Sequence, residues 1–208
     1  MRTHSKETQS SLTPAMALEI LKEGNERFMN NLKANRNLLQ QVNETAAGQF
    51  PFATILSCID SRTSAELIFD QGLGDIFSIR IAGNILNEDI LGSMEFATKI
   101  MKTKIILVLG HSRCGAIVGA CNHVEMGNLT GLLKKIEPAI NKETSTQNNR
   151  SGDNIEFVNN VTELNVLHTI ERIRNESPII MELEKEGLIK IVGGMYNVES
   201  GKVSFLAS

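Results

Sequence analysis

Two short motifs contain the residues best suited to chemistry, Cys58-x-Asp60-x-Arg62 and His111-x-x-Cys114. Two thiolates and an imidazole supply three soft ligands for one zinc ion. A structural zinc site usually closes with four nitrogen or sulfur ligands, whereas three protein ligands leave a position for water or substrate. The motifs therefore predict a catalytic metal held by Cys58, His111 and Cys114.

Asp60 and Arg62 bear on the fourth coordination position. A bidentate pair between them would draw the carboxylate off the metal and hold it as an acceptor for bound water. With the pair broken, the carboxylate would itself become a ligand. An isolated Asp-x-Arg is most often a surface ion pair, but beside Cys58 we favour a functional pair. Asp60 is therefore predicted both as a catalytic residue with Arg62 and as a metal ligand.

The third cysteine and the remaining histidines are weaker candidates. Cys121 lies about two helical turns after Cys114, roughly 10 Å away, and is expected to be a small buried hydrophobe. His4 lies in a polar tail, His123 near a helix end and His168 inside a helical pattern. These three imidazoles are expected to be structural or solvated.

Each metal motif directly follows an apolar run. The runs at residues 52–57 and 104–109 predict buried strands, the second stopped by Gly110. Further elements are predicted as helices at residues 15–32, 65–69, 90–101 and 154–175, strands at residues 75–81 and 188–192, and an edge hairpin at residues 198–203, with Gly193-Gly194 breaking or bulging the last strand. This alternation predicts an α/β fold with a mostly parallel central sheet flanked by helices. Sites in such sheets lie beyond the carboxyl ends of the strands, where both motifs fall.

The composition of the chain limits the number of domains and the classes of partner that we expect. A chain of 208 residues with 41% hydrophobic residues is expected to form a single domain, residues 1–208, with a polar tail at residues 1–13 and an exposed polar loop at residues 141–153. A net charge of −3 without a basic block argues against a nucleic-acid partner or a polybasic membrane contact and favours a small-molecule substrate. No apolar run approaches the roughly 20 residues of a membrane span. Three cysteines cannot all pair within one chain, which favours the reducing cytoplasm.

The chain resembles the β-class carbonic anhydrases over residues 15–208. The matching motifs are Cys58-x-Asp60-Ser61-Arg62, Arg80-x-Ala82-Gly83-Asn84, His111-x-x-Cys114-Gly115-Ala116, and Gly194-Met195-Tyr196-Asn197-Val198 with Gly201-Lys202-Val203. The resemblance implies that Cys58, His111 and Cys114 bind Zn²⁺, and that zinc-bound hydroxide, oriented by an Asp60–Arg62 dyad, converts carbon dioxide reversibly to bicarbonate and a proton. It also implies a four- or five-stranded sheet, an N-terminal helical arm, and a homo-oligomer, dimer or tetramer, whose sites lie near the subunit interface.

The resemblance extends to the substrate pocket. Gln49 stands where many family members place a glutamine that hydrogen-bonds the substrate oxygen, and the Gly115 N–H is a second candidate donor. Bicarbonate-regulated members carry a tryptophan where this chain has Ile55, which argues against that form of regulation. Arg80 keeps its family position, so part of that regulatory site persists.

Other functions fit parts of the same pattern. A hydrolase of carbonyl sulfide or carbon disulfide on the same scaffold would need the same metal site. A non-catalytic regulator would have Asp60 permanently on the zinc, although the presence of Arg62 and Gln49 argues against it. A nucleophilic role for Cys114 is disfavoured, because the phosphate-binding Cys-x5-Arg loop is missing and two other metal ligands are at hand.

Overall fold

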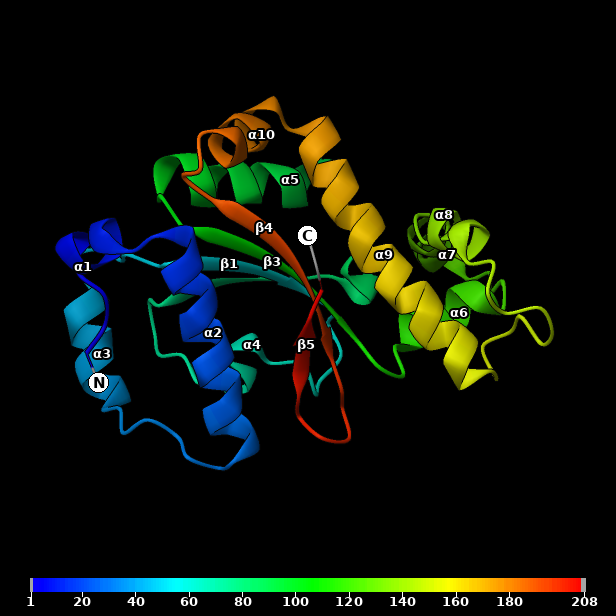
Figure 1. Ribbon diagram of the computed structural model, residues 1–208, viewed down its shortest axis with the longest axis horizontal. Coiled ribbons are helices and arrows are strands. Elements are labelled where there is room, and N and C mark those ends of the chain that lie inside the picture. The colour runs from blue at the N-terminus through cyan, green and yellow to red at the C-terminus, as the bar shows by residue number, and fades with distance from the viewer. Residues whose placement is uncertain (1, 207–208) are drawn as a thin grey trace.

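A five-stranded sheet of order β2-β1-β3-β4-β5 runs through the centre of the molecule (Figure 1). The computed structural model describes residues 2–206 of the chain. The strands are β1 (Ala53–Ser57), β2 (Ile76–Arg80), β3 (Ile105–His111), β4 (Lys190–Tyr196) and β5 (Val203–Phe205). The first four are parallel, and β5 returns antiparallel to β4 as an edge hairpin. The predicted α/β class, mostly parallel sheet and C-terminal hairpin are confirmed.

Helices cover both faces of the sheet (Figure 1). They are α1 (Lys6–Ser11), α2 (Pro14–Met29), α3 (Leu38–Thr45), α4 (Ala65–Ile68), α5 (Glu88–Glu95), α6 (Gly115–Cys121), α7 (Gly127–Leu133), α8 (Glu137–Lys142), α9 (Ile155–Glu176) and α10 (Pro178–Lys185), with a 3₁₀ turn η1 (Ala82–Asn84) and a π-helical turn η2 (Phe96–Ile100). Apolar residues of α2 and α4 pack on one face, and those of α5, α9 and α10 pack on the other. A third apolar cluster joins α6, α7, α8 and α9 around the three cysteines.

The two strands that carry the metal motifs are buried along their whole length. Every residue of β1 and of β3 is buried, and the two strands are neighbours in the centre of the sheet. Parallel strands covered on both faces read as continuous apolar runs rather than as alternating patterns. This burial explains why both strands were recognisable in the sequence.

Glycines in the sheet do not end the strands as the sequence suggested. β3 continues through Gly110 to His111, and β4 continues through Gly193 and Gly194. A Cβ on Gly110 would lie 2.7 Å from Val166 of α9, and one on Gly193 would lie 3.0 Å from the same side chain. These glycines therefore let α9 approach the sheet, and the predicted ligand His111 is part of the strand.

The N-terminal segment is more regular than the predicted polar tail. Ser5 and Thr8 form a capping box at the start of α1, which lies inside that segment. The buried Gln9 side chain donates from Nε2 to the carbonyls of Pro51 and Met101, over 2.6 and 2.8 Å. Short polar helices with such anchors carry little hydrophobic periodicity, so the sequence pattern did not reveal α1.

The first predicted helix starts where expected and ends sooner. Thr13 caps α2 by accepting a hydrogen bond from Met16 N–H over 3.2 Å, with Pro14 in the first turn. The helix ends at Met29 and not at residue 32. Within residues 2–206, none of the helices combines the length and apolar character that a membrane span requires.

The predicted polar loop at residues 141–153 is ordered by a buried charge. α8 extends to Lys142, and the next residue, Glu143, has a side chain only 1% exposed. Its carboxylate accepts hydrogen bonds from Ser145, Thr146 and Arg150. Residues around it are exposed as predicted, but the loop is tied to a carboxylate whose burial the sequence did not reveal.

Candidate active site

Three ligand-type side chains meet at the carboxyl ends of β1 and β3. Cys58 directly follows β1, His111 is the last residue of β3, and Cys114 precedes the first turn of α6. The ligand atoms of these three residues lie within 4.8 Å of one another, and the side chains are buried. Parallel pairing of Ser57 with Leu109 keeps the two strand ends level, so the folded sheet itself brings the motifs together.

The hydrogen bonds of His111 leave one ring nitrogen for a metal. Its Nδ1 lies 3.0 Å from the Ser112 carbonyl oxygen, which only accepts, so Nδ1 carries the proton. The Nε2 atom is buried and has no hydrogen-bond partner among the described residues. A hydrogen bond that fixes the tautomer in this way is the usual support of a metal-bound histidine. The orphaned Nε2 fits a zinc ligand.

The sulfur atoms of Cys58 and Cys114 have the spacing of two zinc ligands. They lie 3.9 Å apart, and two Zn–S bonds of about 2.3 Å at a tetrahedral angle would place them about 3.8 Å apart. The Cys114 thiol donates to Cys58, which lowers the pKa of Cys58 to about 4 and raises that of Cys114. A divalent cation suits this pair because it replaces the shared proton and accepts both sulfurs as thiolates.

Asp60 is paired with Arg62 in bidentate geometry. Arg62 Nε donates to Oδ1 over 2.8 Å and Nη2 donates to Oδ2 over 2.7 Å, and the Arg62 backbone N–H also donates to Oδ1 over 3.0 Å. The Arg62 side chain is the main reason that the pKa of Asp60 lies well below its usual range. The carboxylate is therefore an ionised acceptor beside the ligand cluster.

In this arrangement the Asp60 carboxylate is turned to Arg62 and lies outside the cluster of ligand-type atoms. Among residues 2–206, the metal-type cluster at this site consists of Cys58, His111 and Cys114 alone. Both oxygens of Asp60 are engaged by Arg62, so the prediction of Asp60 as a metal ligand does not match this conformation. The bidentate pair that the sequence offered as the alternative is the arrangement observed.

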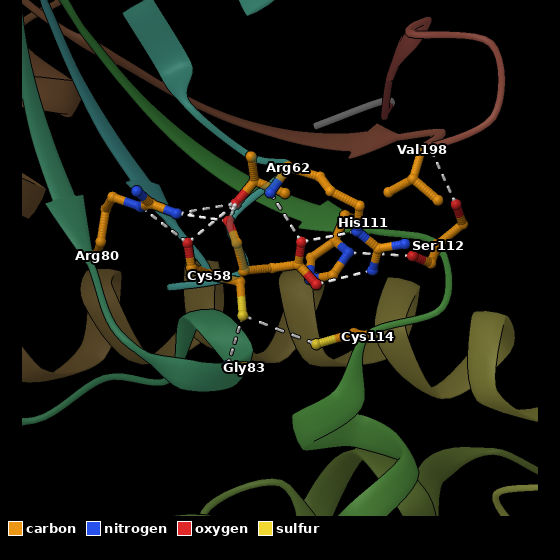
Figure 2. A network of polar contacts seen from close by, with 10 residues as sticks. Cys58, Arg62, Arg80, Gly83, His111, Ser112, Cys114 and Val198 are labelled. Atoms are coloured by element: carbon orange, nitrogen blue, oxygen red, sulfur yellow. Dashed lines mark hydrogen bonds and ion pairs between the residues drawn. The ribbon is translucent and has the colours of Figure 1, made fainter.

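The C-terminal hairpin holds the second motif. The Ser112 N–H donates to the Tyr196 carbonyl over 2.9 Å, and its hydroxyl accepts from the Val198 N–H over 3.0 Å, as Figure 2 shows for Val198. Arg113 forms an exposed ion pair with Glu199 at 2.8 Å. The hairpin thereby fixes the loop between the two ligands of this motif.

Two further residues hold the first motif: Arg80, which the sequence singled out only through the family resemblance, and Thr63, which it did not single out. Arg80, at the end of β2, lies beside Cys58 with its guanidinium directed at the motif (Figure 2). The hydroxyl of Thr63 contacts the carbonyls of Cys58 and Asp60. The signal that could have identified Thr63 is a hydroxyl residue directly after the first motif, because Ser and Thr side chains often form hydrogen bonds with nearby backbone groups.

The other predicted residues fall in different places. Gly115 begins α6 beside Cys114, and a Cβ there would meet nothing within 4 Å. Gln49 lies before the start of β1, at the opposite end of that strand from Cys58. Its Cβ lies 4.0 Å from the position that a Cβ on Gly74 would occupy. Cys121 is buried in the apolar cluster at the end of α6, outside the metal-type group, as expected.

Comparisons with known proteins agree with this geometry. The family model described as carbonic anhydrase matches residues 53–203. Carbonic anhydrase 2 of Mycobacterium tuberculosis is 35% identical over 197 residues, which is 91% of this chain and 91% of that protein. The solved structure of the β-carbonic anhydrase CcaA superposes with a TM-score of 0.71 at 25% identity, over 91% of this chain and 95% of that one.

A further solved structure extends the fold comparison. One of two tetrameric β-carbonic anhydrases from Sordaria macrospora superposes with a TM-score of 0.71 at 23% identity, over 93% of this chain and 95% of that chain. The family match spans both metal motifs and the clustered ligands. With its sheet, its Cys-His-Cys cluster and its relatives all in agreement, this chain belongs to the β-class carbonic anhydrase family of enzymes.

Proposed function

We propose that this protein catalyses the zinc-dependent, reversible hydration of carbon dioxide to bicarbonate and a proton. The observation that carries the proposal is the division of roles at the site: three ligand atoms converge while Arg62 holds Asp60 away from them. Three protein ligands are typical of catalytic rather than structural zinc. When bound, zinc lowers the pKa of a coordinated water to about 7, which makes a strong nucleophile available near neutral pH.

The residues around the metal position then have separate tasks. Asp60, held ionised by Arg62, accepts a hydrogen bond from the nucleophile and so directs its lone pair at the substrate carbon. Arg62 fixes the carboxylate in that orientation. The N–H of Gly115, at the start of α6 beside open space, donates to a substrate oxygen. Carbon dioxide carries no charge, so orientation by such weak contacts is what the site supplies.

Gln49 reaches a site only if a second copy of the chain supplies it. Within one chain, the five residues of β1, a span of about 17 Å, separate Gln49 from Cys58. Gln49 also lies outside the residues matched by the family model. The proposed substrate contact of Gln49 therefore requires a homo-oligomer in which this residue of one copy faces the metal ligands of another.

An assembly built from dimers is also supported by the surface beside the ligands. The Ile59 side chain, directly after Cys58, is 61% exposed. A second copy that brings its Gln49 to this site would cover the exposed Ile59 side chain. The β-carbonic anhydrase from Sordaria macrospora is tetrameric. We propose that this chain forms a dimer or, at most, a tetramer. The cytoplasm is the proposed compartment, because all three cysteines are free thiols.

The test is stopped-flow hydration of carbon dioxide from about pH 6.5 to about pH 9, on protein with measured zinc content. Fast hydration that is lost in Asp60→Asn and Cys114→Ser supports the proposal. Full zinc occupancy without hydration would reject it. Parallel assays with carbonyl sulfide and carbon disulfide then separate a hydrolase of sulfur substrates, active on them alone, from a regulator that is inert toward all three.

A further inference from the structure

The backbone of the first metal motif is gripped by side chains from two other places in the fold. Arg80 Nε donates to the Cys58 carbonyl over 3.0 Å, and its Nη2 donates to the Asp60 carbonyl over 2.5 Å (Figure 2). The Thr63 hydroxyl lies 3.0 Å from the first carbonyl and 2.9 Å from the second. The two carbonyls that receive these donors belong to a metal ligand and to the carboxylate residue beside it.

The position of Arg80 follows from the sheet register. Arg80 is the last residue of β2 and pairs with Ser57, the residue before Cys58. Among residues 2–206, no carboxylate lies within ion-pair distance of Arg80, so the fork of its guanidinium is directed at backbone oxygens. An arginine fork presents several donors in fixed directions, which a lysine cannot match.

Thr63 completes the grip from inside the protein. Its side chain is only 1% exposed, and its hydroxyl also accepts from Arg80 Nη2 over 3.4 Å. The Thr63 backbone N–H donates to the Asp60 carbonyl over 3.0 Å and closes a tight turn. Gly83 adds a contact from η1, where its N–H donates to the Cys58 sulfur over 3.4 Å. The carbonyls of Cys58 and Asp60, on either side of Ile59, are therefore both held by hydrogen bonds.

We propose that Thr63 and Arg80 form a positioning clamp that keeps the fourth coordination position open. This inference rests on the proposed zinc function. With both carbonyls held, the backbone at Asp60 keeps the orientation in which its carboxylate meets Arg62, and this favours the carboxylate staying on Arg62. Without the clamp the loop relaxes, the carboxylate reaches the metal, and an exogenous ligand must compete with it. Thr63 and Arg80 therefore act on the metal position through Asp60.

Azide binding to cobalt-substituted protein tests the clamp, because azide needs an open coordination position and shifts the visible spectrum of Co²⁺. Thr63→Val keeps the shape and charge of the side chain and removes the hydroxyl. The expected result is azide affinity weakened about tenfold or more, with one Co²⁺ still bound per chain. Thr63→Ser, which restores the hydroxyl, should return the affinity to within about twofold of the parent protein.

A matched control separates the clamp from the general loss of a buried hydroxyl. Thr98 is 3% exposed and its hydroxyl donates to the Met94 carbonyl over 2.8 Å. It lies in η2, before the amino end of β3, whereas His111 lies at the carboxyl end of that strand. Thr98→Val should leave azide affinity unchanged. If Thr63→Val does not fold, Arg80→Lys carries the same test, because it keeps the charge but loses the fork. Unchanged azide affinity in a folded clamp variant, or a serine variant as impaired as the valine variant, would overturn the proposal.

Hydrogen exchange in the metal-free protein distinguishes failure of the clamp from failure of the zinc function. The clamp predicts faster exchange across residues 58–63 in Thr63→Val than in Thr63→Ser, with no difference in β4. Parent protein that binds no Co²⁺ would reject the zinc function while this exchange difference still reports the clamp. Equal exchange in the two variants would contradict the clamp whatever metal the protein binds.

Discussion

Arg62 holds both carboxylate oxygens of Asp60, with Nε to Oδ1 at 2.8 Å and Nη2 to Oδ2 at 2.7 Å. This pair lies next to the clustered sulfur and nitrogen ligands but outside the cluster. An exposed ion pair of this kind adds little to stability. The role we propose for the pair is orientation, because a released carboxylate would be free to turn from acceptor to metal ligand.

Arg62→Lys should lower carbon dioxide hydration about 10- to 100-fold, the usual effect of losing a partner that orients a metal site. Lysine keeps the charge but cannot hold both oxygens, so the carboxylate is no longer fixed. Zinc content should remain that of the parent protein. The measurement is kcat by stopped flow with the metal determined on the same sample. Arg174→Lys, which alters a bidentate pair with Glu184 between α9 and α10, is the control. Equal rates in the two variants would contradict a role for the bidentate pair.

Cys114→Ser should lose tightly bound zinc, whereas Cys121→Ala should keep it. The first sulfur lies 3.9 Å from that of Cys58 in the ligand cluster, and the second packs in an apolar cluster at the far end of α6. Burial raises the pKa of the Cys121 thiol to about 11, which suits a neutral core residue rather than a thiolate ligand. Zinc retained after dialysis against a chelator, measured by elemental analysis, gives the answer. Zinc lost from both variants would place Cys121 in the metal site.

The sequence predicted the site better than the segments that surround it. Cys58 follows one strand buried on both faces and His111 ends another, and such strands appear as unbroken apolar runs that are easy to find. Gly110 was misread as a strand end because the sequence does not show that α9 needs the space beside it. Thr63 was missed because its role depends on carbonyls that only the folded turn brings within reach.

Gln49→Ala and Asp60→Asn should complement each other when co-expressed. The structure separates Gln49 and Cys58 by the length of β1, so the proposed substrate contact of Gln49 requires a site on another copy. In a mixed dimer, the chain with intact Asp60 then receives an intact Gln49 from its partner, and one complete site forms. Hydration by tagged, purified mixed dimers should exceed that of either parent variant several-fold. The control is a mixed dimer of Asp60→Asn with Cys114→Ser, which has no complete site. Activity no higher than the control would exclude supply across the interface.

Glu143→Gln should destabilise the protein at neutral pH by about 2 kcal/mol, the scale of hydrogen bonds to a buried charged group. Burial opposes ionisation of Glu143, but hydrogen bonds from Ser145, Thr146 and Arg150 outweigh it and lower its pKa to about 2. A lowered folded-state pKa means that the carboxylate stabilises the fold above the unfolded pKa of about 4.3. That contribution is lost as the pH falls toward 2.

The stability gap between the parent protein and Glu143→Gln should therefore be largest at neutral pH and shrink below about pH 4. Urea unfolding at several pH values measures it. Glu125→Gln, at an exposed position, is the control and should stay within about 0.5 kcal/mol of the parent protein throughout. Glu143 must be ionised while almost fully buried for this difference to arise, because only then does protonation remove the charged hydrogen bonds that the glutamine variant already lacks. A gap that stays constant from neutral to acid pH would mean that the carboxylate's charge does not order this loop.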